Sequence, residues 1–353
     1  LEKVRKEKLT TIPGEEIFKL YDTYGFPTDL VEETAKDAGL TLDMEGYTRA
    51  MNEQKAKAMA SWKGSGEKEV ASFYKEFLQS SPPTIFEGYG TTQGKGRVLA
   101  ILKDQEPVDS ASSGDEIEFL TDKTPFYGES GGQVGDSGRA FNENIQLELN
   151  DANKPLPGLI VHKAKIIQGT LHTEDNLTLE VNRHTRGDIA LNHSATHLLH
   201  AALKEVLGEH IKQAGSLVAS NRLRFDYTHF SPLTDKERIR IESRVNEKIR
   251  ENIKVSTQEM DIDSALKEGA MALFGEKYGE KVRVVNVPGF SKELCGGTHV
   301  TATGDIGLFR ITSEGGIASG VRRIEAVTGA TAYDTIRAEQ ESLSAIRGLL
   351  KAP

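Results

Sequence analysis

The sequence predicts an α+β protein built from three successive stretches of different hydrophobic periodicity. Apolar residues recur at steps of three and four up to about residue 81, at steps of two from about 84 to 180, and in both patterns from 186 onward. We therefore expect an N-terminal helical segment at 1–81, a small glycine-rich β-barrel at 82–185, a mixed α/β subdomain at 186–328 and a closing helix at 329–353.

The first stretch is predicted to be helical because Ile17, Leu20 and Tyr24 lie on one helical face. Gly39 is suited to the position that follows a helix, and Ser80-Ser81-Pro82-Pro83 is typical of a domain boundary. Helices are expected at 9–24, 27–38, 43–63 and about 70–78.

The second stretch contains short runs rich in Val, Ile and Leu, separated by Gly, Asn, Asp and Pro. Frequent turn residues between short strands favour a small barrel or sandwich. Strands are expected at 97–103, 116–121, 145–149, 159–167 and 177–181.

The third stretch mixes both periods. A helix is expected to end at Gly208, and another to begin at Thr234 with Ile239, Val245 and Ile249 on it. Two late strands are expected between 306 and 327, with a turn at Gly315-Gly316. The helices are predicted at 189–207, from 234, and at 330–350, and the other strands at 216–219, 222–227, 254–260 and 282–287.

Composition excludes several classes of protein. The chain has 353 residues, with 44 Lys and Arg against 53 Asp and Glu, so its net charge is −9. This excludes a uniformly basic nucleic-acid binder, and any RNA contact must use a local basic patch. No stretch supplies the roughly 20 apolar residues of a membrane helix, so we expect no membrane partner. The single cysteine is typical of a reducing, cytoplasmic protein. The chain starts at Leu1, and we expect it to be a piece of a longer protein.

The strongest chemical signal is a pair of motifs with matching spacing. His193 and His197 are four residues apart, so a helix places both imidazoles on one face. Cys295-Gly-Gly-Thr-His299 contains two glycines and predicts a tight turn in which Cys295 and His299 can face inward. Three imidazoles and one thiolate form a tetrahedral set suited to Zn²⁺. The sequence therefore predicts a zinc site at His193, His197, Cys295 and His299.

The character of this zinc site is left open by the sequence. Zinc proteases place a glutamate after the first histidine of such a pair, but Ser194 stands here, which argues against that mechanism. Four protein ligands are typical of a structural ion, whereas a catalytic zinc keeps an open position. Either the ion fixes the fold of a pocket, or one ligand leaves when substrate binds.

Two weaker signals accompany the zinc motifs. The segment 124–136 has four glycines between Gly128 and Gly135, which lets backbone N–H groups approach a ligand, although a hairpin with glycine bends is the commoner explanation. Basic residues gather at 183–186, at 222–224 and at Arg322-Arg323, and each group could bind phosphate or simply face solvent.

In this order, the glycine-rich segment, His193-x-x-x-His197 and Cys295-Gly-Gly-Thr-His299 resemble the editing domain of the alanyl-tRNA synthetase family. Free-standing alanyl-tRNA editing proteins share this domain, and threonyl-tRNA synthetase has a related one. The resemblance covers about 84–328, and the matches include 215–218 and 319–329. The segment Leu20-Tyr-Asp-Thr-Tyr-Gly-Phe-Pro27 is similar to the region just before the editing domain of the synthetase itself.

The resemblance implies hydrolysis of the ester in mischarged Ser-tRNA(Ala) and Gly-tRNA(Ala). An aminoacylation pocket for alanine cannot exclude glycine by size and rejects an added hydroxyl poorly, since such differences are worth only about 1–3 kcal/mol. It implies Zn²⁺ as cofactor, the tRNA(Ala) acceptor end as partner, and a full-length protein that ligates alanine to tRNA with ATP. It also implies self-association through a C-terminal region that this chain lacks, its last helix beginning the linker to that region.

The resemblance also implies individual roles. Thr124 is expected to offer its hydroxyl to a seryl side chain, and Gln133 to orient water or the terminal ribose. Arg322 and Arg323 are expected to contact the tRNA acceptor end. Two alternatives to the tRNA ester hydrolase stay open: a non-catalytic tRNA-binding module with a structural zinc, and a zinc hydrolase of small esters or amides.

Overall fold

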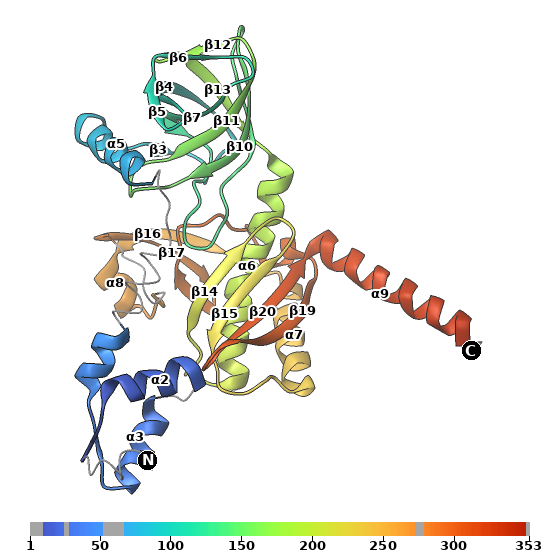
Figure 1. Cartoon of the computed structure of the whole chain (residues 1–353). Coiled ribbons are helices and arrows are strands. Elements are labelled where there is room, and N and C mark those ends of the chain that lie inside the picture. The colour runs from blue at the N-terminus through green and yellow to red at the C-terminus, as the bar shows by residue number, and fades with distance from the viewer. Residues whose placement is uncertain (1–9, 25–27, 52–66, 273–278, 351–353) are drawn as a thin grey trace. The chain divides into compact units, whose positions relative to one another are not determined.

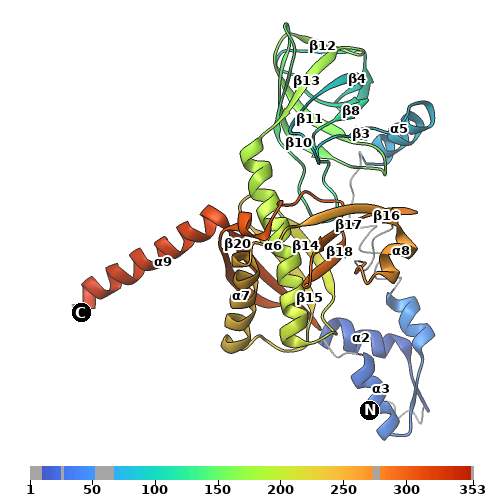
Figure 2. The same ribbon diagram turned by 180° about the vertical axis from the view of Figure 1, so that it is seen from behind.

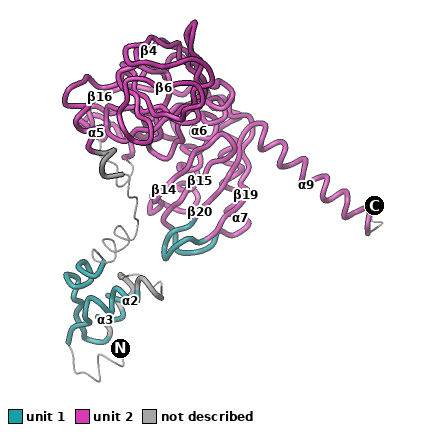
Figure 3. The backbone as a smooth tube through the Cα atoms, turned by 45° about the horizontal axis from the view of Figure 1, so that its top comes forward, with its two compact units in different colours: residues 1–67, 229–232, 316–322 teal, residues 68–228, 233–315, 323–353 magenta. Residues whose placement is uncertain are grey.

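The computed structural model describes residues 10–24, 28–51, 67–272 and 279–350. Contacts between Cα atoms divide the chain into two compact units (Figure 3). The first comprises 1–67 with 229–232 and 316–322, and the second comprises 68–228, 233–315 and 323–353. No helix in the described ranges is long and apolar enough to cross a membrane. The four-part division expected above stays a prediction.

The first unit contains helices α2 (Gly14–Tyr24) and α3 (Thr28–Asp37) and the short parallel strands β1 (Thr11–Ile12) and β2 (Thr41–Leu42). The predicted helix at 9–24 is therefore wrong at its start: the β-branched pair at 11–12 forms a strand, and helical hydrogen bonds begin at the carbonyl of Pro13. Gly39 has φ +70°, as its predicted place after a helix requires. Of the helix predicted at 43–63, residues 44–51 are helical and the remainder lies outside the described residues.

In the second unit, helix α5 (Glu67–Ser80) precedes a six-stranded barrel, of which Figure 1 labels β4, β7, β10, β11 and β13. The barrel order is β13-β9-β10-β11-β7-β4, and pairing of β13 with β4 closes the ring. Closure leaves no exposed sheet edge among these six strands. Their bounds are β4 Gln93–Lys103, β7 Glu116–Thr121, β9 Gly138–Phe141, β10 Gln146–Asn153, β11 Val161–Gln168 and β13 Asn176–Val181.

Alternation along the strands fills the barrel interior. In β10, Leu147 and Leu149 point inward while Gln146 and Glu148 are exposed, which is the period of two that the sequence predicts. All five predicted strands are present, and β9 was missed because it follows a glycine-rich stretch and is only four residues long. Short pairs accompany the barrel: β3 Ile85–Phe86 with β8 Lys123–Thr124, β6 Ser110–Ser112 with β12 Thr170–His172, and β5 Glu106–Val108 on β4.

The rest of the second unit is a mixed α/β assembly around helix α6 (Arg183–Leu207). A four-stranded sheet has the order β14-β15-β20-β19, and a three-stranded sheet has the order β16-β17-β18. Figures 1 and 2 show α6 and α7 on the same face of the four-stranded sheet. The bounds are β14 Gln213–Val218, β15 Leu223–Thr228, α7 Asp235–Arg250, β16 Ser256–Asp261, α8 Ile262–Lys267, β17 Lys281–Val287, β18 Ser291–Leu294, the 3₁₀ turn Thr303–Ile306, β19 Phe309–Ala318, β20 Val321–Thr328 and α9 Gly329–Leu350.

Helix ends follow local capping chemistry. Helix α6 starts six residues before the predicted position because the Asn182 side chain accepts bonds from the amides of His184 and Thr185. Helix α7 has the capping box of Thr234 and Glu237, as its predicted start at Thr234 implies. The predicted turn at Gly315-Gly316 is wrong: both glycines lie inside β19, and the turn lies at Ser319-Gly320, where Gly320 has φ +68°.

Candidate metal centre

Two distant segments bring four ligand-type side chains together. His193 and His197 lie one turn apart on α6, and Cys295 and His299 lie in the loop after β18. Cys295 Sγ is 3.3 Å from Nε2 of both His193 and His299. The four ligand atoms all lie within 4.8 Å of one another. The structure therefore brings these predicted residues together, and the ion itself stays a proposal.

The second ring nitrogen of each histidine is held by a neighbour. His193 Nδ1–H donates to Gln133 Oε1 at 2.7 Å, and His197 Nδ1–H donates to Glu293 Oε2 at 2.8 Å. His299 Nδ1 is 3.2 Å from Ser194 Oγ. The contacts to Gln133 and Glu293 place the protons of His193 and His197 on Nδ1 and leave their Nε2 atoms directed at the cluster, as metal-bound imidazoles require.

The geometry and charge of the cluster fit a divalent ion. Zn–N and Zn–S bonds of roughly 2.0–2.3 Å in a tetrahedron separate ligand atoms by about 3.3–3.8 Å, which includes the observed 3.3 Å. His197 Nε2 is buried and has no hydrogen-bond partner in the described residues, so it is an orphaned polar atom that an ion would satisfy.

Ionisation supports the same fit. Burial raises the pKa of the Cys295 thiol, but the neighbouring imidazoles together lower it by more. The net pKa is therefore well below its ordinary value. Burial likewise opposes ionisation of Glu293, and His197 and His200 outweigh it to lower that pKa. Burial lowers the pKa of His299 to about 3, so its ring is neutral. The cluster thus combines a thiolate and a nearby carboxylate with a neutral imidazole, a balance suited to a dication.

Glu293 is a buried carboxylate that sequence reasoning missed. Its Oε1 accepts from His200 Nδ1 and from Ser291 Oγ, both at 3.1 Å, while Oε2 accepts from His197. Burial lowers the pKa of His197, but Glu293 and Cys295 raise it to about 10, so a proton is held strongly wherever no cation replaces it. The signal available in the sequence was an acidic residue at an inward position of a short strand two residues before Cys295.

Two glycines allow the parts of the site to approach closely. A Cβ at Gly297 would lie 2.0 Å from His193 Cε1, and a Cβ at Gly132 would lie 2.2 Å from Ser216 Oγ. Gly132 also has φ +82°, which disfavours other residues. The glycine-rich segment is joined to β14 by backbone bonds from Val134 N to Val218 O (3.1 Å) and from Val218 N to Gly132 O (2.7 Å).

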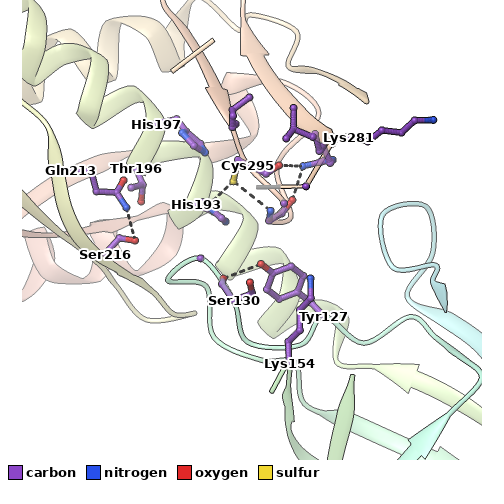
Figure 4. A pocket seen from close by; sticks show the side chains of 17 residues that line it. Tyr127, Ser130, Lys154, His193, Thr196, His197, Gln213, Ser216, Lys281 and Cys295 are labelled. Carbon is purple, nitrogen blue, oxygen red and sulfur yellow. Dashed lines mark hydrogen bonds between the residues drawn. The ribbon is translucent and has the colours of Figure 1, made fainter. Parts of the chain in front are cut away.

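A pocket of about 280 Å³ opens beside the cluster. Figure 4 shows Cys295 beside His193 and His197, with Tyr127 and Ser130 from the glycine-rich segment nearby. Gln213 and Ser216 from β14 supply polar groups, with Gln213 Nε2 donating to Ser216 Oγ at 3.2 Å. The remaining lining residues are Gly131, Lys154, Thr196, Gly279, Lys281, Val282, Arg283, Leu294, Gly296 and Gly297.

The structure places Gln133 behind the cluster and does not bring Thr124 to the pocket. Gln133 is fully buried, and besides His193 its amide contacts the backbone and hydroxyl of Thr298 at 2.9 and 3.0 Å. Thr124 is fully buried in the barrel, where its hydroxyl lies 2.8 Å from His162 Nε2 and accepts from the Phe126 amide. Neither side chain is among those lining the pocket.

The basic residues have individual partners. Arg186 is buried and donates to Asp136 and to the carbonyls of Gly88 and Pro125. Arg323 makes a two-pronged ion pair with Asp226, at 2.7 and 2.9 Å. Arg322 is half-buried in β20, and neither Arg322 nor Arg323 lines the pocket beside the cluster.

The Gly88-Tyr89-Gly90 run, to which sequence reasoning gave no role, borders the centre. Tyr89 Oη donates to the Gly296 carbonyl at 2.6 Å, beside Cys295. The Arg283 guanidinium lies 4.2 Å from the Tyr89 ring centroid.

Comparison with known proteins identifies the class. Residues 1–185 match the family described as tRNA synthetases class II (A), and residues 282–325 match the second additional domain of threonyl and alanyl tRNA synthetases. The first match covers more than half of the chain, so the chain belongs to the class II tRNA synthetase family.

Within that family the resemblance to alanyl-tRNA synthetase is confirmed. The chain is 51% identical over 333 residues to an alanine–tRNA ligase of Xanthomonas campestris pv. campestris (strain B100), covering 94% of this chain and 37% of that protein. It is 50% identical over 340 residues to the ligase of Xanthomonas axonopodis pv. citri (strain 306), covering 96% and 38%. The chain thus spans less than two fifths of these relatives' length.

Proposed function

We propose that this chain carries the editing activity of an alanyl-tRNA synthetase, hydrolysing the ester of Ser-tRNA(Ala) and Gly-tRNA(Ala). The observation that carries the proposal is the convergence of three imidazoles and one thiolate in the wall of a pocket that the glycine-rich segment also lines. The match of residues 282–325 to the domain shared by threonyl and alanyl synthetases supports it.

His193, His197, Cys295 and His299 would hold Zn²⁺. Such an ion supplies Lewis acidity and positive charge next to an ester carbonyl or an amine. The chain's own contribution is to fix the ligands: Gln133 and Glu293 set the tautomer of His193 and His197, and Ser194 contacts the ring of His299. The four-ligand set alone would also suit a structural ion, and the pocket against three of its members favours a role in the reaction.

Pocket chemistry supports discrimination against alanine. Gln213 and Ser216 are half-buried polar groups that can bond the hydroxyl of a seryl ester. With a glycyl ester, a water molecule can occupy the same position. An alanyl methyl would displace that water and leave the polar groups unpaired, which costs about 1–3 kcal/mol per group. We assign hydroxyl recognition to this pair because Thr124 lies in the barrel interior.

The larger framework is also part of the proposal. By similarity to the alanine–tRNA ligases, the whole protein would ligate alanine to tRNA(Ala) with ATP in the cytoplasm and self-associate through regions beyond this chain. The partner of this chain would be the tRNA(Ala) acceptor end carrying Ser or Gly. Arg322 and Arg323 stay predicted contacts for that RNA, and exposed Lys154 and Lys281 add positive charge at the pocket.

The decisive experiment compares release of serine, glycine and alanine from correspondingly charged tRNA(Ala). We expect rapid release of Ser and Gly, and Ala-tRNA(Ala) to be spared. Binding of tRNA without turnover would instead indicate the non-catalytic module, and equal turnover of small esters would indicate a general hydrolase. Cys295→Ala is expected to lower zinc content and hydrolysis together, and a variant that keeps both would refute the ligand assignment.

A further inference from the structure

A second pocket, of about 490 Å³, lies against the candidate metal centre. It has Arg283 in common with the first pocket, and His299 of the cluster forms part of its wall. Its other lining residues are Gly88, Tyr89, Gly90, Thr91, Thr92, Arg183, Arg186, Gly187, Ala190 and Thr298. Loop 88–92, the first turns of α6 and strand β17 therefore meet around this space.

Two guanidinium groups in this pocket have no carboxylate partner among the residues that the structure describes. Exposed Arg183 donates through Nε to Thr92 Oγ1 at 2.9 Å. Arg283 donates through Nη1 to the carbonyls of Cys295 and Gly297, at 3.0 and 2.8 Å, and stacks on Tyr89. Arg186, by contrast, is neutralised by Asp136. Glu259 stands opposite Arg283 in the pairing of β16 with β17 and offsets part of its charge. Arg183 is therefore the principal source of net positive charge in this pocket.

We propose that this second pocket binds a phosphodiester of the RNA acceptor end, with Arg183 as the principal contact; this inference rests on the proposed function. Guanidinium groups match the oxygens of a phosphate in two-pronged geometry. Arg183 uses only Nε on the protein, which leaves its two Nη groups for a ligand. The Thr92 hydroxyl accepts from Arg183 and can donate its own proton to a phosphate oxygen.

Proximity selects a nucleic-acid phosphate over a free anion. An aminoacyl ester held in the first pocket is attached through the terminal ribose to the last phosphodiester of the RNA. Arg283 and the cluster that contains His299 border both pockets, so one continuous ligand can occupy both. A free phosphate ion occupies only one of the two pockets, so it would gain no binding energy from their adjacency.

The test measures binding of an uncharged RNA hairpin that copies the tRNA(Ala) acceptor stem and its single-stranded end. A second hairpin carries an uncharged methylphosphonate at the last internucleotide linkage. Arg183→Gln is the test variant, and Lys165→Gln is the matched control, because Lys165 is an exposed barrel residue that lines neither pocket. Inorganic phosphate is added as a competitor in a separate arm.

We expect Arg183→Gln to weaken binding of the normal hairpin about tenfold and to lower the salt-dependence slope by about one. It should also bind the two hairpins equally, whereas the wild-type protein and Lys165→Gln prefer the normal one. The proposal is overturned if Arg183→Gln loses no more affinity than Lys165→Gln, or still distinguishes the hairpins. Displacement of the wild-type protein from both hairpins alike by millimolar phosphate would instead indicate a free-anion site.

Hydrolysis is measured separately on charged tRNA. If Arg183→Gln has no effect on hairpin binding while the protein still hydrolyses mischarged tRNA, this inference alone is overturned. If Arg183→Gln weakens hairpin binding as expected but the protein hydrolyses no ester, the proposed function is overturned and the phosphodiester site is retained.

Discussion

Gln133 Oε1 accepts two hydrogen bonds at once, from His193 Nδ1 at 2.7 Å and from the Thr298 amide at 2.9 Å. The first bond joins the glycine-rich segment to α6, and the second joins it to the Cys295 loop. Gln133 is therefore a positioning residue for the cluster, held within a buried network.

Gln133→Ala is expected to weaken Zn²⁺ affinity about 10–100-fold, because His193 loses the acceptor that fixes its tautomer. Competition with a chromophoric chelator measures the affinity. Gln133→Glu keeps an acceptor for both N–H groups and should retain most of the affinity. Unchanged zinc binding in Gln133→Ala would show that the ring orientation is set elsewhere.

Gly297→Ala is expected to disrupt the metal centre, since the added Cβ would lie 2.0 Å from His193 Cε1. Gly296→Ala is the matched control, because its Cβ would meet only Tyr89 Oη, at 3.9 Å. Cobalt substitution reports the outcome: the thiolate-to-cobalt absorption should be lost or shifted in Gly297→Ala and preserved in Gly296→Ala. Identical spectra for the two variants would contradict the packing argument.

Ser216→Ala is expected to reduce kcat/KM for Ser-tRNA(Ala) about three- to tenfold, the effect of one neutral hydrogen bond. Gly-tRNA(Ala) has no hydroxyl and loses only a water-mediated contact, so its kcat/KM should fall less and it supplies an internal control. Deacylation of both substrates by one enzyme preparation separates specificity from folding. An equal loss on both substrates would assign Ser216 to the architecture of β14 instead.

His162 predicts a pH dependence of stability. Burial lowers its pKa to about 4, and its Nδ1–H donates to the Phe119 carbonyl. The unfolded chain, with an ordinary pKa near 6.5, binds the proton more readily, so stability is present above pH 6.5 and is lost as pH falls toward 4. The loss between pH 7 and pH 4 is about 3 kcal/mol.

Denaturant unfolding at both pH values measures this loss. His162→Gln, which cannot titrate, should be less stable at pH 7 but show a pH dependence weaker by that amount. An equally steep dependence in His162→Gln would place the responsible group elsewhere.

Local patterns predicted most of the elements, because strand alternation and helix capping act over a few residues. The Thr234 cap and the barrel strands are of this kind. The helix at 9–24 was predicted too long because pairing of Thr11 with Thr41 is a tertiary effect. The Glu293–His197 contact and the buried Arg186–Asp136 pair could not be predicted either, since the two members of each pair lie in distant segments whose meeting depends on the whole fold.

The backbone bonds between Val218 and the glycine-rich segment have a consequence for size selection. These bonds extend the edge of β14 into that segment. Two walls of the first pocket, β14 and the glycine-rich segment, are thus joined by main-chain hydrogen bonds rather than by adjustable side chains. On this side, the pocket cannot widen for a bulkier aminoacyl group without disturbing these backbone bonds. The spacing between these two walls is thereby set by backbone geometry. Substitutions of the lining side chains will change the chemistry of the pocket far more readily than this spacing.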